Sequence, residues 1–576
     1  MKHLVRGLPT SSGIAIGPAW IYRPVHISTD QRPIVNSEAE WCRLEGALAL
    51  AKEQLQTLYL KAVDLVGQAN ADIFQAHQMF LEDPELLGTL NEAVVKQEHN
   101  AEYAVQQSVE TLAQMLLSLD GEYFQARAAD IRDVGRRILY CLSGVLPEDM
   151  ALPQEPVIII AEDLTPSDTV AFDRSKILAF CTLKGGPTSH TAILARSIGV
   201  PATVSTPLPL EDIPNGTLLI LDGSTGEVWV EPNEAELAEA RKKQSAGNTQ
   251  WAIILEAAQK PAFTRDGKQV EVVANIGSAA DARQAVANGA EGVGLLRTEF
   301  LYMDRDSLPS EAEQINVYRE IFAVMGSRPV VVRTLDIGGD KSVSYLGIKE
   351  EANPFLGWRA IRMVSERPEI LVDQFRALLQ AGVDSDLRIM LPMVSNIDEV
   401  IQAKNLLEIS RCQLTEEGKA YAQNVQFGIM IEVPSAALLA SHFAELVDFF
   451  SIGTNDLTQY TLAVDRTNER VANLASPFNP AVVTLIANTI QAAHAKGKWV
   501  GLCGEMAGDP LGTPLLLGLG LDEFSMAPKS IPEVKELLRG LTMEECRKIA
   551  QHVLTLPSAA AVEEYLKKEI AALKPA

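Results

Sequence analysis

The sequence predicts a multidomain α/β protein that combines an α/β domain interrupted by a helical bundle, a linker helix and a C-terminal (β/α)8 barrel. Three observations support this fold class. Short β-branched runs surround a helix-rich tract before residue 233, a charged helix-forming segment follows, and strand-like and helix-like patterns then alternate eight times. A chain of 576 residues is also too long for a single hydrophobic core.

The first α/β domain is predicted from strand-like runs at 13–22, 156–161, 177–183, 202–205 and 218–221. Between the first two runs, apolar residues recur at helical spacing, as at Leu44 and Leu48, and β-branched runs are almost absent. We therefore expect residues 1–32 and 146–232 to form one α/β domain, into which residues 33–145 are inserted as a helical bundle.

A linker helix is predicted at residues 233–260. The segment that follows Asn233 is rich in Glu, Ala, Lys and Arg, which are strong helix formers. Charged residues occur throughout it, as expected for a solvated helix that connects two lobes.

The barrel is predicted for residues 261–576. Helical patterns at 279–288, 311–324 and 481–495 separate some of its strand-like runs. Eight successive β-then-α units match a closed (β/α)8 barrel better than an open sheet. The eight runs lie at 270–276, 292–296, 330–334, 387–392, 427–433, 449–453, 499–503 and 523–526.

Composition excludes several classes of function. The formal net charge of −25 argues against nucleic acid as a partner, because phosphate backbones are bound by clustered Lys and Arg. No apolar run is long enough to cross a membrane, and the N-terminus lacks the apolar core of a signal peptide. The six cysteines show neither disulfide nor zinc-ligand spacing, so we expect a cytoplasmic protein with no membrane insertion.

Polar residues lie at or just after the carboxyl ends of five predicted barrel strands, where active sites of such barrels form. A ring of structural ion pairs is the alternative interpretation, but five strands that deliver polar groups to one rim are hard to explain as surface decoration. The residues are Arg297, Arg333, Glu432, the neighbours Asn455 and Asp456, and Cys503.

The cationic and amide groups at this rim suit a small, multiply anionic, phosphorylated substrate. Arg297 and Arg333 offer planar guanidinium groups that bind phosphate or carboxylate in a bidentate manner. Arg466 follows the sixth strand closely enough to supply a third cation. Asn455 can orient a substrate oxygen.

The remaining rim residues suit a divalent metal and proton transfer. Glu432 and Asp456 are hard oxygen donors, and Mg²⁺ is commonly held by a few carboxylates together with substrate oxygens. Cys503 can donate or accept a proton, with a pKa near neutrality in a suitable environment. An inert buried thiol is the alternative interpretation of Cys503.

His190 has the most distinctive context of the eight histidines. Gly185 and Gly186 follow a predicted strand, and Thr188 is a candidate N-cap, so His190 is expected in the first turn of a helix. Free backbone N–H groups and the helix dipole favour phosphate there, and imidazole forms covalent intermediates. A surface histidine without a role is the alternative, although the paired glycines favour close approach of another molecule.

At these residues the chain resembles the phosphoenolpyruvate–protein phosphotransferase family, enzyme I of the bacterial sugar phosphotransferase system. The resemblance covers nearly the whole chain, and its tracts are long and jointly near-diagnostic. They lie at residues 185–193, 289–300, 333–341, 351–359, 432–434, 448–460 and 501–505, with a further match at 74–85 in the helical bundle.

The resemblance implies that His190 takes the phosphoryl group from phosphoenolpyruvate and passes it to a histidine of the small phosphocarrier protein HPr. It also implies that the α/β domain is a swivelling phosphohistidine domain, that 33–145 binds HPr, and that the protein is a homodimer through its TIM barrel. The site residues implied are Arg297, Arg333, Asn455, Asp456 and Arg466 for phosphoenolpyruvate, Glu432 and Asp456 for Mg²⁺, and Cys503 as the proton donor that yields pyruvate.

Two positions depart from the family pattern, and several rivals remain. Pro187 and Thr467 stand where other residues are common in the family. A pyruvate phosphate dikinase or phosphoenolpyruvate synthase would need an ATP-binding domain of a few hundred residues, and the sequence before residue 180 is predicted to hold a helical insertion instead. A paralogous enzyme that serves a nitrogen-regulatory or dihydroxyacetone-pathway carrier is harder to exclude, and a non-catalytic scaffold conflicts with the intact polar residues.

The acidic excess is concentrated in the tract expected to meet the carrier. Residues 33–145 contain 17 Asp and Glu against 8 Lys and Arg. Acidic docking surfaces speed the encounter with basic partners. The charge that argues against nucleic acid therefore points to a small basic protein, although a merely solvated acidic surface is the simpler alternative.

Overall fold

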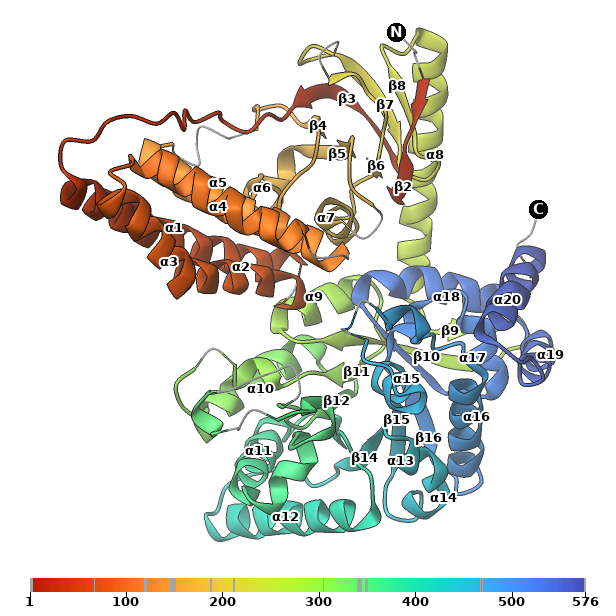
Figure 1. The fold of residues 1–576 in the computed structure, drawn as a ribbon. Helices are drawn as coiled ribbons and strands as arrows, with labels where there is room; N and C mark the ends of the chain where they lie inside the picture. The colour runs from red at the N-terminus through yellow and green to blue at the C-terminus, as the bar shows by residue number, and fades with distance from the viewer. Residues whose placement is uncertain are drawn as a thin grey trace. The chain divides into compact units, whose positions relative to one another are not determined.

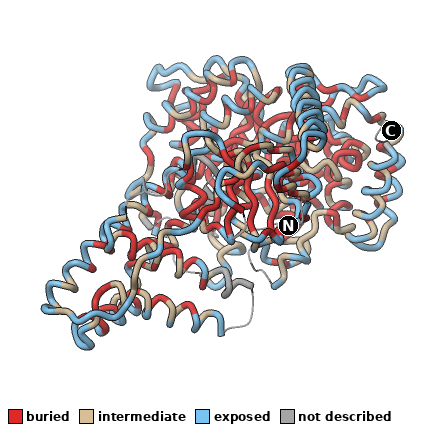
Figure 2. The backbone as a smooth tube through the Cα atoms, turned by 90° about the horizontal axis from the view of Figure 1, so that it is seen from above, coloured by how far each residue is buried: buried red, intermediate tan, exposed pale blue. Residues whose placement is uncertain are grey.

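The computed structural model describes residues 4–66, 68–118, 122–145, 152–186, 189–210, 213–303, 305–338, 344–347, 351–466, 468 and 470–573. The chain forms two compact units, residues 1–250 and 251–576 (Figure 1). Each is described separately below. Buried positions are concentrated along the strands, whereas many helices alternate buried and exposed positions (Figure 2).

The first unit contains an eight-stranded mixed sheet with strand order β1-β8-β7-β3-β4-β5-β6-β2. Strands β3 to β6 pair in parallel, and the outer strands pair antiparallel. All five predicted strands are present, whereas the short strands β1, β2 and β8 were not predicted. The bounds are Leu4–Arg6 (β1), Leu8–Ser11 (β2), Ile14–Ile21 (β3), Val157–Ala161 (β4), Ile177–Thr182 (β5), Ala202–Val204 (β6), Leu218–Asp222 (β7) and Glu227–Val230 (β8).

The chain between β3 and β4 forms a helical bundle with its own apolar core. Leu44, Leu55 and Phe74 are among its fully buried side chains. Asp83 caps the helix that begins at Pro84, which ends the preceding helix and turns the chain. The helices are Ser37–Val66 (α1), Gln68–Leu81 (α2), Pro84–Asn91 (α3), Ala101–Leu117 (α4) and Glu122–Ser143 (α5), with a π-helical turn at Glu92–Lys96 (η1).

Two short helices of the α/β layer follow strands of the parallel part of the sheet. Pro166–Ala171 (α6) comes after β4, and His190–Ile198 (α7) comes after β5. The charged segment predicted as a linker is one long helix, Glu234–Ala258 (α8). The boundary between the two compact units falls within this helix, at residue 250.

The second unit is a closed parallel barrel, because β10 pairs with both β11 and β17. The eight predicted strands are all present, so the predicted multidomain α/β fold with a (β/α)8 barrel is confirmed. The strands are Gln269–Ile276 (β10), Val293–Leu296 (β11), Val330–Arg333 (β12), Leu387–Leu391 (β13), Gln426–Ile431 (β14), Phe449–Ile452 (β15), Trp499–Leu502 (β16) and Glu523–Met526 (β17), and the short Ala262–Phe263 (β9) adds an antiparallel pair to β10.

Helices surround the barrel (Figure 1), and their buried apolar residues join those of the strands in one hydrophobic core. Irregular segments and short 3₁₀ turns connect several strands to their helices. The helices are Ala279–Ala287 (α9), Glu311–Met325 (α10), Pro368–Ala381 (α11), Ile397–Glu416 (α12), Pro434–Leu438 (α13), Ala440–Phe443 (α14), Thr454–Leu462 (α15), Pro480–His494 (α16), Thr513–Leu519 (α17), Ile531–Gly540 (α18), Met543–Val553 (α19) and Ala559–Leu573 (α20).

The helices that the structure describes are too short or too polar to span a bilayer. Within the ranges described above, no helix combines the length and the apolar character that crossing a membrane requires.

Candidate active site

The mouth of the barrel is built around Arg333, the last residue of β12. Its side chain is buried and pairs with Glu299, which follows β11, and with Asp336, at 3.0 Å between Nη1 and Oδ2. Burial lowers the pKa of Arg333, but the two carboxylates raise it, and the net result is a raised pKa. The guanidinium is therefore a permanent cation, and its Nε has no hydrogen-bond partner among the residues that the structure describes.

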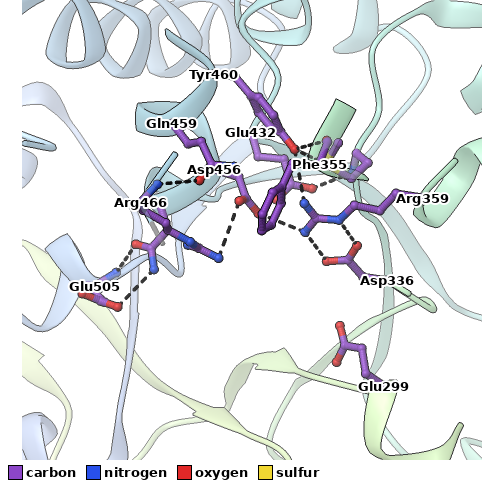
Figure 3. Close-up of polar contacts among 12 residues, drawn as sticks. Glu299, Asp336, Phe355, Arg359, Glu432, Asp456, Gln459, Tyr460, Arg466 and Glu505 are labelled. Atoms are coloured by element: carbon purple, nitrogen blue, oxygen red, sulfur yellow. Dashed lines mark hydrogen bonds and ion pairs between the residues drawn. The ribbon is translucent and has the colours of Figure 1, made fainter. Parts of the chain in front are cut away.

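Arg359 joins the two sides of the mouth (Figure 3). Its Nε and Nη2 donate to the two carboxylate oxygens of Asp336, at 2.8 and 3.0 Å, and Nη2 also donates to Asp456 Oδ2, at 3.2 Å. The side chain is buried. Arg359 belongs to one of the tracts that resemble the family, but it was not predicted as a site residue. It lies between 3₁₀ turns and not at a strand end.

Tyr460 extends this network and was also not predicted. Its hydroxyl accepts a hydrogen bond from Arg359 Nη1, at 3.2 Å, and donates to the carbonyl of Phe355, at 2.6 Å. Burial raises the pKa of Tyr460 to about 12, so the hydroxyl stays protonated and serves as a donor. Tyr460 lies one helical turn after Asp456 on α15, so this i, i+4 spacing was a usable signal.

Two buried carboxylates, Glu432 after β14 and Asp456 on α15, point into the mouth (Figure 3). Glu432 Oε1 accepts from the backbone N–H of Met393, at 2.5 Å. Burial and the charge of Asp456 raise the pKa of Glu432 to about 8. Asp456 Oδ1 accepts no hydrogen bond from any described residue and lies 3.7 Å from Arg466 Nη2. This pair of carboxylates would be stabilised by a cation.

The other predicted substrate residues lie at the edge of the mouth. Asn455 and Glu505 form reciprocal hydrogen bonds: Asn455 Nδ2 donates to Glu505 Oε1, at 3.2 Å, and the Glu505 N–H donates to Asn455 Oδ1, at 3.1 Å. Arg466 is exposed, and its backbone N–H donates to Gln459. Arg297 is exposed after β11. These exposed cations can reach a bound anion, although Arg466 also lies within ion-pair distance of the buried Asp456, at 3.7 Å.

Cys503 directly follows β16 and is buried. Its thiol contacts the carbonyl oxygen of Ile452, at 3.8 Å from Sγ. Burial raises the pKa of the Cys503 thiol to about 11. The expectation of a pKa near neutrality is therefore wrong for this environment, because the low dielectric disfavours the thiolate. A protonated thiol is the form that can donate a proton.

His190 is the first residue of α7 in the other unit, and it is exposed. Ser189 caps the helix through its hydroxyl, which accepts from the Ala192 N–H at 3.4 Å. Gly185 precedes it with φ of 94°, a conformation that favours glycine. The predicted cap Thr188 and the family departures Pro187 and Thr467 lie outside the described residues.

The imidazole of His190 is kept neutral by its surroundings. Partial shielding from water lowers the pKa of His190, and His77 acts in the same direction, while Asp130 opposes them. His77 and Asp130 come from α2 and α5, at 3.6 Å between Nε2 and Oδ1. A neutral ring nitrogen retains the lone pair that a nucleophile needs.

The metal-ligating capacity of the mouth rests on two carboxylates. Across the part of the chain that the structure describes, no group of three or more His, Cys, Asp or Glu side chains is arranged to hold a metal ion. Glu432 and Asp456 can supply two oxygen ligands, and Mg²⁺ commonly takes its remaining ligands from water and substrate.

Three family models match the chain. The model described as "PEP-utilising enzyme, PEP-binding domain" matches residues 254–543, which include the barrel mouth. The model "PEP-utilising enzyme, N-terminal" matches 6–127, and "PEP-utilising enzyme, mobile domain" matches 153–226, which include His190.

Similar curated proteins match along almost the whole chain. A phosphoenolpyruvate-protein phosphotransferase from Geobacillus stearothermophilus is 46% identical over 98% of this chain and 98% of its own length. That of Bacillus subtilis (strain 168) is 44% identical over 98% of this chain and 99% of its own. Among solved structures, an NMR solution structure of an Enzyme I protein is 36% identical and covers 42% of this chain and 99% of that chain, with a TM-score of 0.37.

Proposed function

Because the chain belongs to the phosphoenolpyruvate-protein phosphotransferase family, we propose that it moves the phosphoryl group of phosphoenolpyruvate to His190 and then to a histidine of HPr. The reaction releases pyruvate and is the first step of sugar uptake by the phosphotransferase system. The observation that carries the proposal is a barrel mouth with buried arginines and carboxylates on a chain that also presents a capped, neutral histidine at a helix start.

Phosphoenolpyruvate is a compact trianion, and the mouth has cations suited to it. Arg297 and Arg466 are exposed there, and the Nε of buried Arg333 is unpartnered within the described part of the chain. We assign these three arginines to the phosphate and carboxylate groups, with Asn455 and Asp456 completing the substrate contacts. Arg359 joins the assignment as the residue that holds Asp336 and Asp456 in place.

Mg²⁺ fits the donor set of Glu432 and Asp456. Asp456 Oδ1 has no hydrogen-bond partner in the ranges that the structure describes, and the pKa of Glu432 is raised by burial and by the neighbouring carboxylate. A divalent cation would compensate both. When bound, Mg²⁺ would neutralise charge on the transferring phosphoryl group. Its other ligands would be water and substrate oxygens.

The transfer exchanges one bond to phosphorus for another. The bond between phosphorus and the enol oxygen breaks as a bond to a neutral ring nitrogen of His190 forms, and the arginines stabilise charge in the transition state. The enolate that remains takes a proton at its methylene carbon from the Cys503 thiol, giving pyruvate and a thiolate. The raised pKa of Cys503 supports this donor role, because the thiol is protonated at neutral pH.

Transfer requires the histidine and the barrel mouth to meet, and then requires the histidine to meet the carrier. His190 and the arginines lie in different compact units. We propose that 1–32 and 146–232 swivel as a phosphohistidine domain relative to the barrel of 261–576, with residues 233–260 as the linker.

Residues 33–145 are proposed as the HPr-binding subdomain. The tract has 17 acidic against 8 basic residues, which suits a basic partner. It also exposes large apolar side chains, including Met79 (73% exposed) and Met115 (56% exposed), and methionine is common on binding surfaces. A paralogous carrier is not favoured, because relatives that match nearly the whole chain carry the general phosphotransferase name.

A second copy of the chain is the proposed partner of the barrel. An apolar groove lies between α13, α15 and α16, lined by Pro434, Leu438, Tyr460 and Leu485 among others. Leu438 is 70% exposed there, which is typical of an interface. A cytoplasmic location is also proposed, because all six cysteines are free thiols.

The function is tested by phosphoryl transfer from radiolabelled phosphoenolpyruvate with Mg²⁺. The full-length chain is expected to become labelled in acid-labile form, and purified HPr is expected to discharge it, whereas a nitrogen-regulatory or dihydroxyacetone-pathway carrier is not. His190→Ala should not be labelled. Persistent labelling of His190→Ala would contradict the assignment of the nucleophile, and discharge by another carrier alone would contradict the assignment of the acceptor.

A further inference from the structure

Three polar residues on adjacent strands form a chain of hydrogen bonds that ends at Cys503. Asn275 lies near the carboxyl end of β10, and its Nδ2 donates to the carbonyl oxygen of Cys503, at 2.9 Å. Ser525 of β17 donates from its hydroxyl to Asn275 Oδ1, at 2.6 Å. Strand β17 pairs with both β10 and β16, so the Asn275 side chain crosses over β17 to reach the residue that follows β16.

The two bonds fix the orientation of the Asn275 amide. Only the NH₂ group of an amide can donate to the Cys503 carbonyl, so a flipped amide would lose that bond and turn its oxygen toward the carbonyl oxygen. The parallel register between β10 and β11 shifts at Ala274 and Asn275, an irregularity of the kind that redirects side chains beside active sites. The lack of a side chain at Gly294 leaves space for the Ser525 hydroxyl, since a Cβ at this position would lie 2.5 Å from it.

The backbone around Cys503 has little freedom apart from this bond. The Cys503 N–H donates to the carbonyl of Ile452, at 3.0 Å. On the other side, a Cβ at Gly504 would lie 1.8 Å from the Thr454 hydroxyl, so the chain is packed closely there. The Cys503 carbonyl belongs to the peptide group between Cys503 and Gly504. A hydrogen bond to this carbonyl sets the plane of that peptide group and, with it, the direction of the thiol.

We propose that Asn275 is a positioning residue for protonation of the enolate, acting through its hydrogen bond to the Cys503 carbonyl, with Ser525 fixing the amide. The inference rests on the proposed role of Cys503 as proton donor. In that step the S–H bond of the thiol breaks, a C–H bond forms at the methylene carbon of the enolate, and the thiolate later regains a proton from water. A thiol displaced by about 1 Å would protonate the enolate up to about 100-fold more slowly.

Three variants of the full-length chain test this role with Mg²⁺, phosphoenolpyruvate and purified HPr, which takes the phosphoryl group from His190 and allows turnover. Asn275→Ala removes the bond, Asn275→Asp keeps the size but loses the donor, and Ser525→Ala releases the amide. We expect kcat for pyruvate formation to fall about tenfold or more in both Asn275 variants and less in Ser525→Ala, with KM unchanged. Asn288→Ala is the matched control, because Asn288 Nδ2 also donates to a backbone carbonyl, that of Gln284 at 2.9 Å, on an outer helix.

The stereochemistry of protonation separates positioning from a structural effect. Phosphoenolpyruvate labelled stereospecifically with deuterium and tritium at its methylene carbon should give pyruvate of one methyl chirality with the native chain and with Asn288→Ala. The Asn275 variants should give mixed chirality, because water then protonates part of the enolate. If Asn275→Ala does not fold, Asn275→Asp and Ser525→Ala carry the same test.

The inference is overturned if the folded Asn275 variants keep native kcat and a single methyl chirality, or if only KM rises. Cys503→Ser tests the proton-donor role separately from the positioning role. If Cys503→Ser is slow while the Asn275 variants behave like the native chain, only the positioning role of Asn275 is excluded. A fully active Cys503→Ser enzyme would remove the role of Cys503 and the inference with it.

Discussion

At the mouth of the barrel, Arg333 and Arg359 are buried between carboxylates, whereas His190 is exposed at the start of α7 with a neutral ring. The mouth has a network of ion pairs whose partners come from separate strand ends and loops. The histidine has a helix cap, a glycine turn and a few charges from the inserted bundle.

The difference follows from what each region must do in the proposed reaction. A trianionic substrate is stabilised best by charges already oriented in a water-poor site, which avoids reorganisation when the bond breaks. The nucleophile must leave one partner and reach another, so strong buried ion pairs at His190 would oppose its movement. The following predictions test this contrast, beginning with the largest effect.

Removing a buried cation should be most damaging. Arg333→Met leaves Glu299 and Asp336 without their shared partner, and we expect kcat/KM for labelling by phosphoenolpyruvate to fall about 1,000-fold. The loss of a buried pair should also lower the free energy of unfolding of the barrel by about 3–5 kcal/mol. Urea unfolding and steady-state labelling measure the two effects.

The matched control for this change is Arg411→Met on α12, where the guanidinium pairs with Glu408 one turn away. That pair lies on the outer helix, so its loss should cost less than about 1 kcal/mol and leave labelling unchanged. Equal effects of the two substitutions would show that the mouth network has no special role.

Changing the shape of a cation while keeping its charge should have a smaller effect. Arg359→Lys retains a positive charge but loses the planar fork that donates to both oxygens of Asp336 while it also reaches Asp456. We expect kcat/KM to fall about tenfold to 100-fold, because Asp456 is no longer held in place. Native kinetics in Arg359→Lys would mean that charge alone suffices.

The pH dependence of His190 should reflect its lowered pKa. NMR titration of the full-length chain should place its midpoint below the ordinary value of 6.5, so the ring stays neutral at neutral pH and the labelling rate declines only in more acidic solution. Since His77 lowers this pKa, His77→Gln should raise the midpoint. A midpoint above 6.5 in the native chain would contradict the assigned environment.

Loss of the helix cap should have the smallest effect. Ser189→Ala removes the acceptor for the Ala192 N–H and should cost about 1 kcal/mol of local stability. Hydrogen exchange of the first turn of α7 measures this, with Ser310→Ala, which uncaps α10, as the matched control. A large loss of labelling in Ser189→Ala alone would assign Ser189 a chemical role beyond capping.

The sequence was sufficient to predict the barrel and the strand-end location of Glu432 and Cys503, because strand periodicity and the rule for barrel mouths depend on local pattern. Arg359 could not be found in that way, since an irregular segment carries it into the mouth through tertiary contacts. The pKa of Cys503 was also misjudged, because burial of a thiol is a property of the packed core.

The most direct test of the central claim is to locate the phosphoryl group on the full-length chain after incubation with phosphoenolpyruvate and Mg²⁺. Mass spectrometry of peptides prepared at alkaline pH, where phosphohistidine survives, should find one phosphoryl group per chain, on His190, and none on His77. A phosphoryl group on any other residue, or the same level of phosphorylation in His190→Ala, would contradict the account.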